Sequence, residues 1–158
     1  MAVDTDDIEA KAARKLSRGL VDEMIGFRFR RIQNEIGRRF KQRISRDEVN
    51  TGTFSALALI DANPGLSQAE LSAEIGMDRA TIVALVDALE GNGWAKRTRD
   101  KADRRRHSLG ITAAGRKELA RLGALALQNE EVLRRAIGAG GMKDLFALLD
   151  KIDKALAE

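Results

Sequence analysis

The chain has 158 residues, of which 44% are hydrophobic and 33% charged, so it can bury a core and favours one domain or one compact core with helical extensions. It has no cysteine and one histidine, which excludes disulfides, thiolate catalysis and an ordinary Cys/His metal site. The formal net charge is only +4, yet residues 94–106 hold seven lysines and arginines against two aspartates, a net of +5. Such a concentration of charge is typical of an element that binds a polyanion, although a solvated basic run is the alternative.

The first ten residues carry four carboxylates, unlike the basic start of a secretory signal. No apolar run approaches the roughly 20 residues that span a bilayer. We therefore expect a cytoplasmic protein without a membrane segment.

Two helices are predicted before residue 63. Ile25, Phe29, Ile32, Ile36 and Phe40 recur at spacings of three and four, which predicts a long amphipathic helix over roughly residues 16–43. Residues 51–62 form a more apolar helix that the turn at 63–65 ends.

Two short helices with recognisable starts follow. Ser67 and Glu70 have the spacing of a capping box, so one helix begins at Ser67 and ends at Gly76. Asp78 can cap the next helix, which runs to about Glu90. Two helices joined by a glycine-containing turn are typical of a helix-turn-helix, whose second helix enters the DNA major groove.

A basic hairpin is predicted next. Residues 94–99 alternate, with Trp94 on one face and Ala95 on the other, and residues 107–111 form the partner strand. Thr112 can cap a following helix, which residues 138–141 interrupt, and the last helix is apolar enough to need a partner. We read Trp94 as a core residue and His107, the single histidine, as structural or phosphate-facing.

The predicted fold is mostly α with a small β-wing: a winged helix-turn-helix domain with N- and C-terminal dimerisation helices. Residues 1–45 form the tail and first dimerisation helix, 46–113 the DNA-binding domain and 114–158 the C-terminal dimerisation helices, all in one continuous structural unit.

The chain resembles the MarR family of bacterial transcriptional regulators, which are winged helix-turn-helix homodimers. The most specific part is the wing Asp103-Arg104-Arg105, six residues before the hydrophobic-Thr-x-x-Gly helix start at Ile111. The supporting segments are LSAEIG at 71–76, TIV at 81–83, LVDALE at 85–90, GWAKR at 93–97, DRR at 103–105 and ITAAG at 111–115.

The resemblance implies that Arg105 enters the minor groove and that Asp103 positions its guanidinium. A narrow minor groove attracts arginine because it concentrates negative potential. Arg104 and Arg106 are then assigned to phosphate or solvent, and Lys101 to phosphate. The DNA-binding candidates are Ser67, Gln68, Arg79, Ala80, Thr81, Ala84, Lys101, Asp103, Arg104, Arg105 and Arg106.

The second helix of the pair offers few base-reading groups. If Ile82, Leu85, Val86 and Leu89 face the core, then Ala80, Val83, Ala84 and Asp87 face outward. Members of the family often carry Thr and Arg where this chain has Val83 and Ala84. Arg79 could pair with guanine and the methyl groups could contact thymine methyls, or the small residues merely favour helix.

We therefore predict a sequence-specific DNA-binding regulator that is a homodimer on a pseudo-palindromic operator, a repressor released by a small organic ligand such as an aromatic acid or acyl-CoA thioester. The alternative is a ligand-independent architectural or protein-interaction winged-helix module. No enzyme is expected, since no catalytic set or phosphate-binding glycine loop is found, and no cofactor or metal either. The family implies a ligand cleft; its candidate residues are Met24, Phe27, Arg28, Arg31 and Phe54. The arginines of such a helix are normally a solvated face, but they could also hold an acidic ligand.

Overall fold

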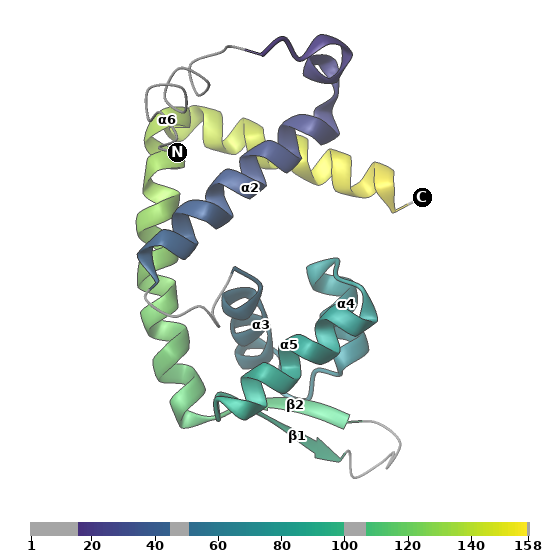
Figure 1. Cartoon of the computed structure of the whole chain (residues 1–158), viewed down its shortest axis with the longest axis vertical. Helices are drawn as coiled ribbons and strands as arrows, with labels where there is room; N and C mark the ends of the chain where they lie inside the picture. The colour runs from purple at the N-terminus through teal and green to yellow at the C-terminus, as the bar shows by residue number, and fades with distance from the viewer. Residues whose placement is uncertain (1–15, 45–50, 100–106, 158) are drawn as a thin grey trace, which may run out of the picture. The chain divides into compact units, whose positions relative to one another are not determined.

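The computed structural model describes residues 16–44, 51–99 and 107–157 (Figure 1). The chain divides into two compact units, residues 1–35 and 36–158, which are described separately below. Among the described residues, no helix combines the length and the apolarity needed to cross a membrane.

In the first unit, a short 3₁₀ helix precedes the long helix. The 3₁₀ helix is η1, Gly19–Glu23, and the helix α2 covers Ile25–Arg43, continuing into the second unit. The predicted start near residue 16 is therefore wrong by about two turns. Gly19 has a φ of 50° and Met24 is extended, so regular helix cannot form before Ile25.

The end of α2 packs within the second unit. Phe40 is buried, and its ring centroid lies 6.5 Å from that of Phe54 in α3, Thr51–Ala62. Asn129 is also buried and donates its side-chain amide to the carbonyl of Ile36 at 3.2 Å. These two contacts tie α2 to α3 and to the last helix.

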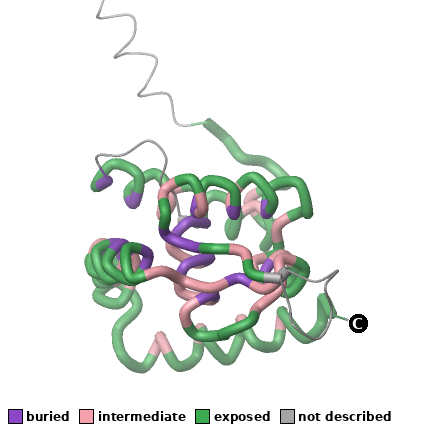
Figure 2. The backbone as a smooth tube through the Cα atoms, turned by 90° about the horizontal axis from the view of Figure 1, so that it is seen from below, coloured by how far each residue is buried: buried purple, intermediate pink, exposed green. Residues whose placement is uncertain are grey.

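Three helices enclose the core of the second unit. They are α3, α4 (Gln68–Ile75) and α5 (Arg79–Gly91), and the bounds of all three agree with the prediction to within a residue. The largest completely buried side chains are aliphatic, because the chain has few aromatic residues to fill the space. In Figure 2 the buried positions gather where these helices meet the strands. The core is centred on Leu57, Ile60, Leu71, Ile82, Val86, Leu89, Leu109 and Leu122.

The predicted hairpin is present at the edge of this core. β1 (Ala95–Arg99) pairs antiparallel with β2 (His107–Ile111), with Ala95 opposite Ile111 and Arg99 opposite His107. The expected alternation of Trp94 and Ala95 is wrong, since both are buried. Trp94 precedes the strand and follows the turn at Gly93, where φ is 70°, so the period-two rule of a strand does not yet apply.

A third short segment joins the hairpin. Leu66 accepts a hydrogen bond at 2.7 Å from the amide of Leu109, and Ser67 forms an isolated bridge with Ser108. The residue that caps α4 is therefore attached directly to β2.

The last helix, α6, covers Ala113–Leu156 and packs along α3 (Figure 1). Thr112 caps it as predicted: its hydroxyl accepts from the amide of Gly115 at 2.9 Å and donates to the carbonyl of Gly93 at 2.6 Å. The sequence predicts an interruption of this helix at residues 138–141. Within α6 only Gly138 has non-helical dihedral angles, φ 74° and ψ 165°.

Candidate nucleic-acid interface

Both short helices begin with side-chain caps. The hydroxyl of Ser67 accepts from the amide of Glu70 at 3.2 Å, while the Glu70 carboxylate accepts from the amide of Ser67 at 2.8 Å, so the predicted capping box is confirmed. Asp78 caps α5 by accepting from the amide of Thr81 at 2.9 Å and from its hydroxyl at 2.6 Å. The hydrogen bond from the Thr81 side chain is the main reason that the pKa of Asp78 lies below its ordinary value. Thr81, predicted to contact DNA, thus uses its hydroxyl proton within the cap.

One face of α5 is buried and the opposite face is exposed, as the spacing predicts. Ile82, Val86 and Leu89 are buried, and Leu85 packs against them from the edge. The outward face has little polarity, since methyl groups provide most of it. Its exposed residues are Arg79, Ala80, Val83, Ala84 and Asp87.

A hollow of about 370 Å³ lies between α4 and α5. Ser72 and Ile82 form part of its wall, and Arg79 at the start of α5 also lines it. Within the described part of the chain Arg79 forms no ion pair, so its guanidinium is available to a phosphate or a base. The remaining lining residues are Gln68, Ala69 and Val83.

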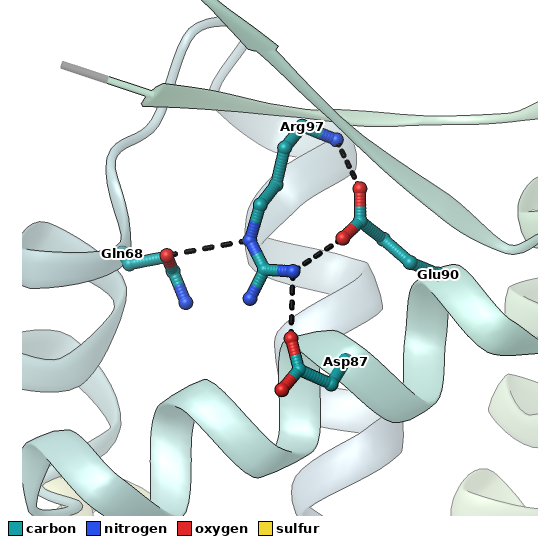
Figure 3. A network of polar contacts seen from close by, with 4 residues as sticks. All are labelled: Gln68, Asp87, Glu90 and Arg97. Atoms are coloured by element: carbon teal, nitrogen blue, oxygen red, sulfur yellow. Dashed lines mark hydrogen bonds and ion pairs between the residues drawn. The ribbon is translucent and has the colours of Figure 1, made fainter. Parts of the chain in front are cut away.

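Arg97 of β1 joins the hairpin to both helices (Figure 3). Its Nη1 lies 2.7 Å from Oδ1 of Asp87 and also contacts Oε2 of Glu90, while its backbone amide donates to Oε1 of Glu90 at 2.6 Å. Its Nε donates to Oε1 of Gln68 at 3.4 Å. Burial alone lowers the pKa of Arg97, but the hydrogen bonds and charges of the two carboxylates outweigh it and raise the pKa above the ordinary value.

Sequence analysis missed this network because it counted Arg97 with the positive charge offered to a polyanion. The guanidinium is instead largely buried, with 22% of the side chain exposed, and compensates two carboxylates of α5. Asp87 and Glu90 lie three residues apart on one helix face just before the hairpin, which is the signal that could have indicated an internal partner. Gln68 is only half-buried, but its Nε2 is buried and has no acceptor among the described residues.

The predicted wing contacts stay predictions. Lys101, Asp103, Arg104, Arg105 and Arg106 lie outside the described residues.

The candidates for a ligand cleft divide between the two units. In the first unit, the guanidinium of Arg31 lies 5.9 Å from the ring centroid of Phe27, and Nε of Arg28 donates to the carbonyl of Asp22 at 2.8 Å. Met24 is exposed there, and Phe54 belongs to the second unit. None of these contacts tests the cleft itself.

Comparisons with known proteins agree with this architecture. Residues 49–107 match the family model described as "MarR family". The chain is 32% identical over 139 residues to the putative transcriptional regulatory protein for the hcr operon of Thauera aromatica, an alignment that covers 87% of this chain and 84% of that protein.

Solved structures give the same result. The transcriptional repressor CouR bound to a 23-mer DNA duplex superposes with a TM-score of 0.78 at 35% identity, covering 89% of this chain and 99% of that one. CouR bound to p-coumaroyl-CoA superposes with a TM-score of 0.76 at 34% identity, covering 88% and 98%.

Proposed function

The chain belongs to the MarR family of DNA-binding transcriptional regulators, and on that premise we propose that it is a repressor that leaves its operator on binding an aromatic acyl-CoA thioester. The observation that carries the proposal is the similarity along nearly the whole chain to CouR, a repressor solved both on DNA and with p-coumaroyl-CoA. The exposed face of α5 and the hairpin would supply the DNA contacts.

On DNA, α5 would enter the major groove and the wing the minor groove. Arg79 stands at the start of α5, where helix-turn-helix proteins approach bases and phosphates. In the wing, Arg105 would insert into the minor groove with Asp103 positioning it, and Lys101, Arg104 and Arg106 would face phosphates. Ser67 and Gln68, at the start of α4, would lie near the DNA backbone.

A homodimer would place two such heads on a pseudo-palindromic operator. The described parts of α2 and α6 expose many large apolar side chains, which a partner subunit would bury. On α6 these are Leu127, Val132, Ile137, Phe146, Leu148 and Leu156, and on α2 they include Ile25 and Ile32.

Phe146→Asp is therefore expected to shift the protein from dimer to monomer. The side chain is 51% exposed in the single chain, so the change leaves the fold of one subunit intact, whereas a charge buried without a partner in an interface is strongly unfavourable. Sedimentation at micromolar concentration measures the change, with circular dichroism as the check of folding. A wild-type protein that sediments only as a monomer would contradict the dimer.

The effector would bind beside α2. Phe27, Arg28 and Arg31 follow the spacing of one helix face, so an aromatic ring and two cations occur together. This set suits an aromatic acyl group joined to an anionic carrier, because arginine pairs with phosphate and stacks on rings. Met24, which is exposed in the same unit, would add an apolar contact.

The effector proposal is tested on an operator duplex selected by the protein from a random library. Adding p-coumaroyl-CoA should weaken binding, measured by fluorescence anisotropy, by about 5- to 150-fold, the usual range of coupling between two sites. Free p-coumarate is added in a separate titration, in which weaker binding to the operator would indicate an acid effector. Coenzyme A alone should leave the affinity for the operator unchanged. Arg31→Ala should require much more thioester for release, whereas Arg30→Ala, the same change at a neighbouring exposed position, should behave as wild type.

Two outcomes would contradict the proposal at different levels. If neither thioester nor acid changes binding to a specific operator, the effector class is wrong. If the protein binds operator and random duplex equally, the architectural alternative holds instead.

A further inference from the structure

We infer that α5 recognises its half-site through thymine methyl groups in the major groove, with Val83 as the central contact and Ala80 and Ala84 beside it. The inference rests on the proposed function, since it requires a specific operator. It assigns to this face a defined chemical preference, for A·T pairs whose C5-methyl groups point toward the helix.

The geometry of the exposed face supports an apolar contact. Ala80, Val83 and Ala84 are spaced by three and four residues, so their methyl groups lie together on one side of α5. All three are exposed, and the side chain of Val83 is the largest of them, at 40% exposure. Val83 also lines the hollow of about 370 Å³, next to Ala69 of α4. Three of the residues that line it, Ala69, Ile82 and Val83, are aliphatic.

The polar groups around this face favour the same conclusion. The hydroxyl proton of Thr81 is donated to Asp78, and the charge of Asp87 is compensated by Arg97. A carboxylate already paired with a guanidinium is a poor acceptor for the amino group of cytosine. On the exposed face of α5 itself, Arg79 at the amino end remains as a donor.

Thymine is the base that matches the exposed methyl groups of α5. In the major groove each base pair presents its own pattern of donors and acceptors, and the C5-methyl of thymine is the apolar feature among them. Valine and alanine side chains can contact that methyl without leaving a buried polar group unpaired. A face of methyl groups therefore selects positions of thymine rather than a hydrogen-bonding pattern.

Replacing single thymines of the selected operator by deoxyuridine tests the inference, because uracil keeps base pairing and phosphates and removes only the methyl. We expect one or two positions in each half-site where the replacement weakens binding about three- to fivefold, the effect of exposing one buried methyl group. Symmetric replacement in both half-sites should weaken it by about tenfold or more. The measurement is anisotropy at one fixed salt concentration, since affinity for DNA depends on salt.

A double-mutant cycle then links the methyl to the side chain. In Val83→Ala, which favours helix and removes an exposed side chain, the penalty for deoxyuridine at the sensitive position should fall below twofold. In Val21→Ala, the same change at a valine of η1 with 41% exposure, the penalty should stay as in wild type. The cycle also removes any effect of uracil on DNA stiffness, because that effect is common to both proteins.

Three results bear on the inference differently. A specific operator with no uracil-sensitive thymine overturns it and leaves the proposed function intact. A sensitive thymine whose penalty persists in Val83→Ala overturns the assignment to Val83. Equal binding of operator and random duplex would contradict the proposed function. This comparison is made with unmodified DNA, before any thymine is replaced by deoxyuridine.

Discussion

Gly115→Ala is expected to destabilise the protein by about 3 kcal/mol, at the upper end of what overpacking usually costs. A Cβ atom at this position would lie 1.9 Å from the carbonyl oxygen of Trp94 and 2.8 Å from Cγ1 of Ile111. The nearest atom belongs to the backbone, so it cannot rotate away as a flexible side chain would. The same carbonyl accepts the amide of Thr112 at 3.0 Å, so moving it would also loosen the start of α6. Chemical denaturation at one protein concentration measures the loss.

Gly123→Ala is the matched control in the same helix. Its Cβ would meet only Cε2 of Phe54, at 3.7 Å, which is an ordinary contact. Because alanine is the better helix former, this variant should be as stable as wild type or more stable by up to about 1 kcal/mol. Equal stability of the two alanine variants would show that the close approach of α6 to Trp94 is not rigid.

Arg97→Ala is expected to lower the free energy of unfolding by about 1 to 2 kcal/mol, because hydrogen bonds to charged partners are lost and two carboxylates remain. The expected loss of stability is no larger because Asp87 is 60% exposed, so water can solvate its carboxylate once Arg97 is removed. DNA affinity should fall about tenfold on operator and random duplex alike, since uncompensated carboxylates then face the phosphates. Denaturation and anisotropy are the two measurements.

Arg116→Ala controls for the loss of one positive charge. Arg116 pairs with Asp61 at 2.9 Å, but its side chain is 63% exposed and the pair joins α6 to α3. Stability should change by less than about 1 kcal/mol and DNA affinity by less than about twofold. If both variants weaken DNA binding equally, net charge rather than the Arg97 network controls affinity. Arg97→Lys should be intermediate, because an ammonium cannot bridge three acceptors with the fixed geometry of a guanidinium.

The helix starts could be predicted because their determinants are local. Ser67 with Glu70, Asp78 with Thr81 and Thr112 with Gly115 are each three residues apart, so the pattern is complete within one turn. The prediction failed at the start of α2, because the helix was extended back to residue 16 although the apolar stripe itself begins at Ile25, where the helix begins. A dihedral angle such as φ 50° at Gly19 is permitted by glycine but not required by it.

Contacts between distant residues were beyond sequence analysis. The bond from Arg97 to Gln68 spans 29 residues, and the bond from Leu109 to Leu66 spans 43. Neither bond belongs to a short sequence motif. Both depend on the position of the hairpin, which the turn at Gly93 sets. The charge pattern identified a basic segment, but it could not show that Arg97 within this segment is used internally.

The hydrogen bond from Leu109 to Leu66 has a consequence for the DNA itself. It fixes the base of the wing to the cap of α4, so the hairpin cannot swing independently of the helix pair. The duplex turns by about 36° for each base pair, at about 10 base pairs per turn. A single base pair inserted between the sequence under α5 and the sequence under the wing would rotate one of them out of phase with its protein contact. Under the proposed mode of binding, spacing within each half-site is therefore as much a part of the recognition signal as the bases are.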